Sequence, residues 1–280
     1  MTGRLVVCAT PIGNLGDAPP RLAEVLRAAD VVYAEDTRRS RVLLTALGID
    51  RSLRSYFVGN EEQRSEELVG HLESGRTVAL ITDAGMPSIS DPGVSAVRQA
   101  RRIGAEVAVV PGPSAVTAAL ALSGFDAQRF VFEGFLPRKG AERTDRLAAL
   151  AAEERTIVFF SATHRIARDL TDLSSHLGAD RPVAVCRELT KRHEEVRWET
   201  LTEAVEHLEE HGARGEFTVV IQGAPQVAPS LDEALSEVLR SIERGESLAV
   251  AVRMVANERR VARGALYQAA LDATRKTPAD

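Results

Sequence analysis

The chain has 280 residues, of which 44% are hydrophobic and 27% are charged, and its formal net charge is −5. This composition is typical of a soluble globular protein with one large or two ordinary domains, and the negative charge argues against wholesale coating of nucleic acid. No apolar run approaches about 18 residues, and the amino terminus lacks a signal-peptide arrangement. A membrane span and secretion are therefore disfavoured, and we expect a cytoplasmic protein.

The first part of the chain alternates short apolar runs with helical patterns. We expect strands at residues 4–9, 31–35, 77–81 and 106–110, and helices at 19–29, at 37–47, from Asp91, and after the Pro-Gly-Pro-Ser turn at 111–114. In the third of these helices Asp91 would be the N-cap and Pro92 the first helical residue. Strands that alternate with helices indicate an α/β domain with a largely parallel sheet.

A second block of the same kind begins near Phe125. Strands are expected at 129–135, 156–160, 182–186 and 217–221, with helices after the polar and basic segment 137–146, from His164 and from Thr202. The pattern predicts a second α/β domain.

The end of the chain has a different character. Residues 224–230 are rich in Ala and Pro and are typical of a linker, and helices are expected at 231–242, 247–255 and 260–274. Such short helices cannot form a sizeable independent core, so they should pack on a neighbour in this chain or in a partner chain. From residue 253 onward the tail is the most basic part of the chain, although a solvated helix face is the commoner explanation for such charges. The predicted domains are 1–122, 123–225 and 226–280.

Several kinds of reactive site are disfavoured by the sequence. Cys8 and Cys186 lie inside apolar strand-like runs, which suits reduced core residues better than a disulfide or a metal site. The six His residues have no metal-ligand spacing, so we expect no metal. The chain has no nucleophile elbow and no Walker loop, which disfavours a hydrolase and an NTPase.

Four loops follow predicted strands of the first domain. They are TPIGNL at 10–15, AEDTR at 34–38, the loop of ITDAGMPSISDPG at 81–93, and PGPS at 111–114. The carboxyl ends of parallel strands meet at one edge of a sheet, so these loops should frame a cleft for a small molecule. TPIGNL lacks the spacing of a dinucleotide-binding turn, and its glycine would let the backbone approach a ligand closely. By itself, AEDTR could equally be a helix N-cap with an ordinary ion pair.

Seven motifs in order carry a resemblance to a known family. They are the four loops, with PGPS extended to PGPSAVTAA, and FEGFLP at 132–137, THR at 163–165 and RELTK at 187–191. In this order and spacing they resemble the bacterial ribosomal RNA small-subunit methyltransferases I, which belong to the tetrapyrrole-methylase superfamily. The tail from Gly245 to Leu271 is similar to the small helical element at the end of that family.

The resemblance implies a fold, a cofactor and a reaction. It implies two α/β domains of the tetrapyrrole-methylase type with a cofactor cleft between them, plus a small carboxy-terminal helical element. The protein would bind S-adenosylmethionine, act as a homodimer, and methylate the ribose 2′-oxygen of a cytidine in the decoding region of 16S rRNA, within the small ribosomal subunit. The cofactor-binding residues would be Gly13, Asn14, Asp83, Gly85, Pro87, Ser88, Ile89, Ser114 and Ala115.

Catalytic candidates follow from what methyl transfer to a hydroxyl requires. The reaction needs alignment, loss of the hydroxyl proton and stabilisation of the developing oxyanion. Glu35 and Asp36 could orient or deprotonate the hydroxyl, and Arg38 and Lys191 could hold phosphate or lower the pKa of the oxygen. For each residue an ion pair at a domain seam is an equal alternative.

RNA contacts are expected from basic loops, with the target nucleotide extruded from structured RNA into the cleft. The candidates are Arg38, Arg39 and Arg41, the loop around Arg138 and Lys139, and the basic tail.

Two alternatives stay open, the first because the superfamily has other substrates and the second because the sequence departs from the family pattern. Many relatives have His-x-His-Asn-Glu where this chain has Phe57-Val-Gly59-Asn-Glu61, and Glu where it has Ser161. One alternative is a methyltransferase of the same superfamily that acts on a small molecule such as a tetrapyrrole. The other is a non-catalytic RNA-binding assembly factor.

Overall fold

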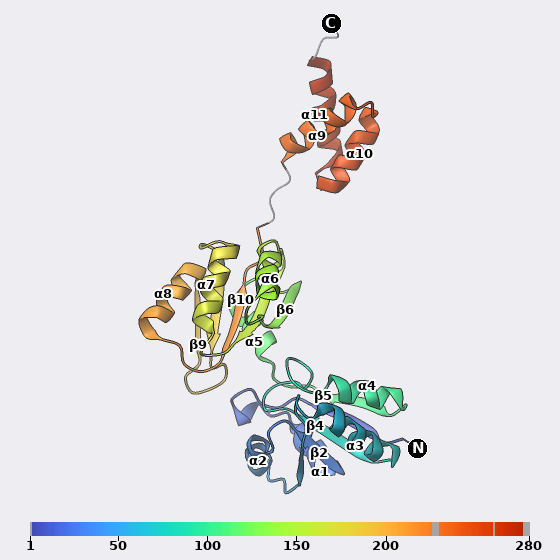
Figure 1. Cartoon of the computed structure of the whole chain (residues 1–280), viewed down its shortest axis with the longest axis vertical. Helices are drawn as coiled ribbons and strands as arrows, with labels where there is room; N and C mark the ends of the chain where they lie inside the picture. The colour runs from blue at the N-terminus through green and yellow to red at the C-terminus, as the bar shows by residue number, and fades with distance from the viewer. Residues whose placement is uncertain (1, 226–229, 260, 277–280) are drawn as a thin grey trace. The chain divides into compact units, whose positions relative to one another are not determined.

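The computed structural model describes residues 2–225, 230–259 and 261–276, without the side chains of residues 275 and 276. The chain divides into two compact units, Met1–Ala224 and Pro225–Asp280 (Figure 1). The first unit is α/β and holds two sheets, and the second is helical. The predicted fold class is confirmed, whereas the division of the first unit at residues 122 and 123 stays a prediction. None of the described helices is both long and apolar enough to cross a membrane.

The first sheet is parallel throughout. Its order is β3-β2-β4-β1-β5, and the strands are β1 (Arg4–Cys8), β2 (Val31–Ala34), β3 (Leu53–Ser55), β4 (Thr77–Ile81) and β5 (Glu106–Val110). The expected parallel sheet is confirmed, with β3 as an additional edge strand. The sequence did not reveal β3 because three residues are too few to establish an alternation.

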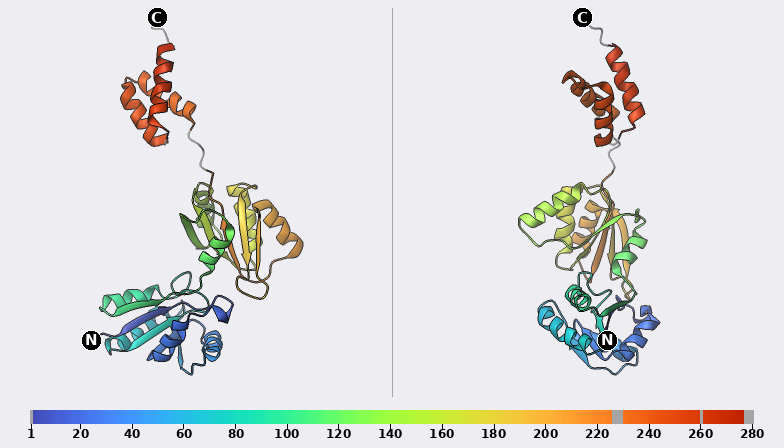
Figure 2. Two further views of the ribbon diagram at one scale, coloured as in Figure 1. Left: turned by 180° about the vertical axis from the view of Figure 1, so that it is seen from behind. Right: turned by 90° about the vertical axis from the view of Figure 1, so that its right-hand side faces the viewer.

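Two pairs of helices cover the two faces of this sheet, which lies between them in the right-hand view of Figure 2. One face packs against α1 (Pro20–Ala28) and α2 (Thr37–Ala46), and the other against α3 (Glu61–Glu73) and α4 (Val94–Arg102). Both faces of the three inner strands β1, β2 and β4 are therefore buried, which explains their continuous apolar runs. Cys8 is a free buried thiol in this core, as predicted, and Cys186 is one in the second sheet.

The expected helix start at Asp91 is wrong. Helix α4 begins at Val94, and its N-cap is Gly93 with a φ of 143°. An Asp-Pro-Gly sequence is compatible with a cap, but a φ in this region requires glycine, so the chain turns at residue 93 and leaves Asp91 in the loop.

The second sheet is mixed, with the order β6-β7-β10-β8-β9. Its strands are β6 (Phe130–Phe135), β7 (Thr156–Ser161), β8 (Pro182–Arg187), β9 (Glu195–Thr200) and β10 (Phe217–Ile221), of which only β6 and β7 pair in parallel. The strand β9 was not predicted, because charged residues dominate its sequence EVRWET. The helices expected from His164 and Thr202 begin at Ile166 and Leu201.

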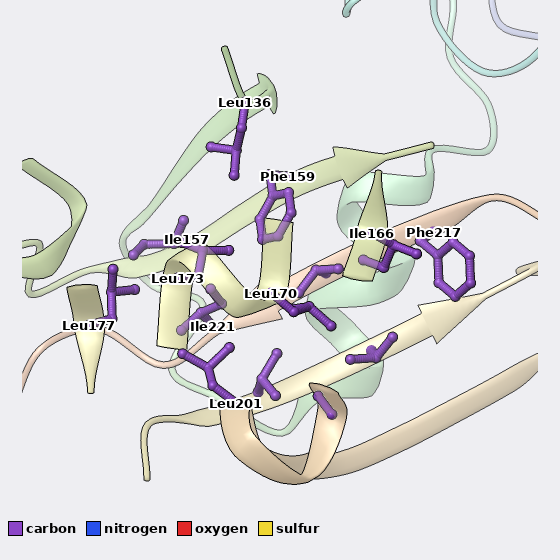
Figure 3. Close-up of a cluster of buried hydrophobic side chains, with 14 of the residues drawn as sticks. Leu136, Ile157, Phe159, Ile166, Leu170, Leu173, Leu177, Leu201, Phe217 and Ile221 are labelled. Atoms are coloured by element: carbon purple, nitrogen blue, oxygen red, sulfur yellow. The ribbon is translucent and has the colours of Figure 1, made fainter. Parts of the chain in front are cut away.

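Helices cover both faces of the second sheet as well. α6 (Ala141–Ala151), α7 (Ile166–Leu177) and α8 (Leu201–His211) lie on one face, where Phe159, Leu170 and Ile221 belong to the cluster in Figure 3. α5 (Ala115–Ser123) follows β5 of the first sheet but packs on the other face of the second sheet. α5 therefore carries the chain from the loop at 111–114 directly onto the second sheet.

The helical unit contains α9 (Leu231–Glu243), α10 (Leu248–Arg259) and α11 (Arg263–Lys276). Small and aliphatic residues from all of them, including Val238, Val252 and Leu266, form one buried cluster. The expectation that such short helices cannot form a core of their own is wrong, because small side chains let three short helices pack closely on one another. The expected packing on a neighbour stays a prediction. The predicted linker and the predicted helix start at residue 260 fall partly on residues 226–229 and 260, which lie outside the described residues.

Candidate active site

The loops at the carboxyl edge of the first sheet are bonded to one another. Thr10 and Gly85 form an antiparallel bridge, with N–O distances of 2.8 and 3.1 Å, and the Thr10 hydroxyl donates to the Thr82 carbonyl at 3.1 Å. The Asp36 amide donates to Asp83 at 3.0 Å, and the Asp83 amide donates to Glu35 at 3.3 Å. Three of the four predicted loops are thereby joined around the loop that follows β4.

A cavity of about 320 Å³ lies beside these loops, between the two sheets of the α/β unit. This volume is within the range of small-molecule sites. Its wall is mostly apolar, with polar groups at a few positions. The apolar members include Ile12, Met86, Ile89, Phe135, Phe160 and Leu189, and the polar members are Ser90, Asp91, Ser114, Ser161, Lys191, Glu216 and Thr218. An apolar wall with a few polar groups suits a cofactor that has both an aromatic part and a charged part.

The predicted cofactor residues divide into two groups. Gly85, Ile89, Ser114 and Ala115 line the cavity, and so does Lys191 from the catalytic set. Gly13, Asn14, Asp83, Pro87 and Ser88 are not in its wall. Asn14 caps the short helix Leu15–Asp17 by accepting the Gly16 amide at 2.9 Å.

Gly13 brings the two sheets together at the cavity. A Cβ atom on residue 13 would lie 2.4 Å from Cγ of Lys191 and 2.8 Å from Oγ1 of Thr190. The absence of a side chain at residue 13 therefore leaves room for the loop after β8. It would also let a ligand approach the main chain closely.

A Gly13→Ala substitution should separate these two loops. We expect a loss of about 1–3 kcal/mol of unfolding free energy, typical of overpacking, and about tenfold weaker cofactor binding. Chemical denaturation and calorimetric titration with S-adenosylhomocysteine measure the two effects. Gly70→Ala is the matched control, because a Cβ at Gly70 in α3 has nothing within 4 Å. If Gly13→Ala and Gly70→Ala had the same unfolding free energy and the same cofactor affinity, the proposed contact would be refuted.

Backbone strain is concentrated in the two loops at the cavity. Among the described residues, the non-glycine residues with a positive φ are Ser88 (75°), Ser90 (63°), Glu188 (49°) and Thr190 (66°). Such conformations cost on the order of 1 kcal/mol each and cluster at functional sites. The buried hydroxyls of Ser88 and Thr190 also have no hydrogen-bond partner. Unpartnered hydroxyls in strained loops fit a site that is completed by a ligand.

Asp36 and Arg38 have the arrangement that the bare AEDTR pattern allowed. Asp36 is the N-cap of α2 and accepts from the Arg38 amide at 2.8 Å and from its guanidinium at 3.1 and 2.8 Å. These bonds from Arg38 lower the pKa of Asp36 to about 2. A carboxylate with so low a pKa is a weak base and is better suited to orientation than to proton transfer.

Asp91 is a functional candidate that the sequence reasoning missed, because the residue was interpreted as a helix cap. Its side chain lines the cavity and is half-buried. Burial, followed by the charge of Glu35, raises the pKa of Asp91 to about 7. Burial also raises the pKa of Glu35, which is half-buried. A carboxyl group with a pKa near neutrality can accept a proton at physiological pH.

Lys191 is held in place at the opposite side of the cavity. Its ammonium group donates to Glu188 and Glu216, each at 2.8 Å. Burial lowers the pKa of Lys191, but the bonds to the two carboxylates outweigh burial and raise it. The side chain therefore remains a cation in a fixed position.

Ser161, one of the departures from the family pattern, also lines the cavity. Its hydroxyl donates at 2.7 Å to Asp169, which is 1% exposed and accepts from Arg143 at 2.9 Å. The serine is thus anchored to a buried ion pair. Within the described part of the chain, no three His, Cys, Asp or Glu side chains are grouped as a metal site would require.

Comparisons with known proteins agree with this geometry. Residues 4–205 match the family model of the Tetrapyrrole (Corrin/Porphyrin) Methylases. The "Ribosomal RNA small subunit methyltransferase I" of Synechocystis sp. is 44% identical over 273 residues, covering 96% of this chain and 98% of that protein. The protein of the same name from Thermotoga maritima is 45% identical over 221 residues, covering 79% of this chain and 99% of that protein.

Among solved structures, a uroporphyrin-III C-methyltransferase from Thermus thermophilus, complexed with S-adenosylhomocysteine, superposes with a TM-score of 0.57. It is 22% identical, and the match covers 79% of this chain and 97% of that one. This likeness establishes the common fold.

Proposed function

The chain belongs to the family of ribosomal RNA small subunit methyltransferases I, and we propose on this basis that it methylates the ribose 2′-oxygen of a cytidine in the decoding region of 16S rRNA. The observation that carries the proposal is 44% identity over 96% of the chain, together with a cavity of cofactor size at the strained loops. The reaction is a methyl transfer from S-adenosylmethionine.

The residues at the cavity fit this cofactor. Gly85, Ile89, Ser114 and Ala115 would lie against it, and the hydroxyls of Ser90, Ser114 and Thr218 in the cavity wall can hydrogen-bond its polar groups. When bound, the cofactor would supply a sulfonium methyl group that an oxygen nucleophile can accept, with the thioether S-adenosylhomocysteine as the leaving group. The main-chain turns at Gly85, Ser88 and Ser90 are formed in advance, so little ordering cost remains for binding.

The side chains at the site divide the remaining tasks. Asp91 is proposed as the proton acceptor for the ribose hydroxyl, with Glu35 beside it to keep its pKa high. Asp36 orients Arg38, whose side chain is 90% exposed and can meet an RNA phosphate. Lys191 lies in the cavity wall as a fixed cation that can stabilise the developing oxyanion.

The partners of this reaction are also part of the proposal. The printed names of the relatives support ribosomal RNA as the substrate. An assembled small subunit and a homodimer are supported by the motif resemblance alone. A cytoplasmic location is supported by the sequence, in which no apolar run approaches the length of a membrane span. Arg38, Arg39 and Arg41, the exposed pair Arg138 and Lys139, and the helical tail are the proposed phosphate contacts.

The first test is transfer of a labelled methyl group from S-adenosylmethionine to 30S subunits isolated from a strain that lacks this protein. We expect label in one alkali-resistant dinucleotide, because a 2′-O-methyl group blocks cleavage of the adjacent phosphodiester. Nuclease mapping then identifies the nucleotide. Saturable cofactor binding without label on 30S subunits, but with transfer to a tetrapyrrole, would replace this proposal by the small-molecule alternative. No cofactor binding at all would favour the assembly factor.

A further inference from the structure

An aromatic ring is exposed on the turn after β3. Phe57 is 45% exposed and its neighbour Val58 is 77% exposed. The turn is nevertheless ordered, because the Phe57 amide donates to the Asn60 side chain at 2.8 Å and the Asn60 amide donates to the Phe57 carbonyl at 2.9 Å. The two neighbouring exposed side chains form a small apolar patch on a bonded turn, which is a candidate binding surface.

This turn lies at the edge of the sheet that holds the proposed active site. β3 pairs in parallel with β2, with Ser55 opposite Ala34, and the Tyr56 amide donates to the Ala34 carbonyl at 2.8 Å. Phe57 and Asp36 each follow two residues after this pair, so both leave the sheet at the same edge.

Glu61 ties the same turn to the loop that follows β4. Its carboxylate accepts from the Gly93 amide at 3.1 Å and from the Ser95 amide at 3.2 Å. The exposed ring therefore has a fixed place at the rim of the site.

Gly59 is shaped to the ring of Phe57. A Cβ atom on residue 59 would lie 2.6 Å from Cε2 and 3.3 Å from Cδ2 of that ring. The ring therefore lies against the bare main chain at Gly59, which supports it from one side. Phe57 and Gly59 both depart from the family pattern, and they fit each other, since any other residue at position 59 would displace the ring.

The surroundings indicate which partner meets this ring. Exposed arginines from the start of α2 lie on the same edge, with Arg38 and Arg39 side chains 90% and 70% exposed. Part of their charge is matched by Asp36 and Asp83, and their remaining donors face solvent. An aromatic ring that shares one edge of a sheet with arginine donors can form a platform for an unpaired nucleobase. We propose that Phe57 stacks on an unpaired base of the RNA substrate next to the methylated nucleotide. This inference rests on the proposed function.

Substitution at Phe57 tests this role through the balance between KM and kcat. We expect Phe57→Ala to raise KM for 30S subunits about tenfold, with kcat and cofactor affinity within about twofold, because stacking contributes to RNA binding alone. Phe57→Trp should retain the wild-type KM. The matched control is Val58→Ala, which removes a more exposed apolar side chain from the same turn. Equal KM values for Phe57→Ala and wild type would overturn the proposal.

A second readout does not depend on methylation. The chain has a single tryptophan, Trp198, so a Trp198→Phe, Phe57→Trp variant carries one fluorophore at the proposed platform. We expect saturable quenching by a single-stranded oligoribonucleotide and by 30S subunits. Quenching without methyl transfer would leave the platform standing while the proposed reaction fails. Absence of quenching by both probes, or an effect of Phe57→Ala on 30S binding that Val58→Ala reproduces, would overturn the platform and point to a protein contact.

Discussion

Replacing Asp91 by Asn should lower methyl transfer by about 100-fold or more, because removal of a positioned general base typically costs this factor. The wild-type rate should rise with pH up to about 7, where the Asp91 carboxyl ionises, and then level off. Glu35→Gln should move this limb to lower pH, because the charge of Glu35 contributes to the raised pKa of Asp91. Single-turnover rates at saturating cofactor and 30S subunits, measured across pH 5–9, report this limb.

Asp91→Asn should also make the folded protein more stable at alkaline pH. The pKa of Asp91 is raised from 3.8 to about 7, so the folded state holds the proton more tightly than the unfolded state. The protonated Asp91 carboxyl stabilises the folded state fully at a pH below its pKa in the unfolded state. This stabilisation is lost as the pH rises through its pKa in the folded state. The Asn side chain cannot ionise, so its advantage should grow between the unfolded pKa of 3.8 and the folded pKa of about 7, to about 1–2 kcal/mol, a value reduced for partial exposure.

The matched control for both effects is Asp50→Asn, which removes an exposed carboxyl group between α2 and β3. This variant should keep the wild-type rate and show no pH-dependent gain. An active Asp91→Asn enzyme with an unchanged pH limb would exclude Asp91 as the proton acceptor. If Glu35→Gln abolished methyl transfer instead of shifting the pH dependence of the rate, Glu35 and not Asp91 would be the proton acceptor.

Arg143→Leu should cause the largest loss of stability, about 3–5 kcal/mol, because it leaves the buried carboxylate of Asp169 with only one cationic contact, the longer one of 3.4 Å to Arg165. Arg143 is 4% exposed and donates to Asp169 at 2.9 Å and to Asp172 at 2.8 Å. Asp169 also accepts the Ser161 hydroxyl from the cavity wall, so the loss should reach the cofactor site as weaker binding. Urea denaturation and calorimetric titration measure the two consequences.

A second substitution separates the buried charge from the lost packing. Arg143→Leu combined with Asp169→Asn removes the stranded charge and should recover part of the stability. Arg155→Leu breaks a more exposed pair with Glu153 and should cost at most about 1 kcal/mol. If Arg143→Leu cost no more than Arg155→Leu, the buried pair would have no structural importance.

The sequence by itself determined the parts of this protein that depend on local pattern. Apolar runs of strand length and helical periodicity placed most strands and helices of both α/β blocks, and the parallel first sheet followed from their alternation. Because parallel strands end at one edge, the loop at 81–93 could be assigned to a site before any contact was known. The ordered motifs identified the family, and relatives with 44% and 45% identity confirm that assignment.

Only the tertiary structure decided the chemistry of individual side chains. Asp91 differs from an ordinary helix cap because the turn at Gly93 leaves it in the cavity wall near Glu35, and a pKa depends on such neighbours rather than on sequence position. Gly13 lies against Lys191, a residue far from it in the sequence, and the ring of Phe57 lies against Gly59. Such contacts depend on packing at the scale of single atoms, which neither periodicity nor motif spacing encodes.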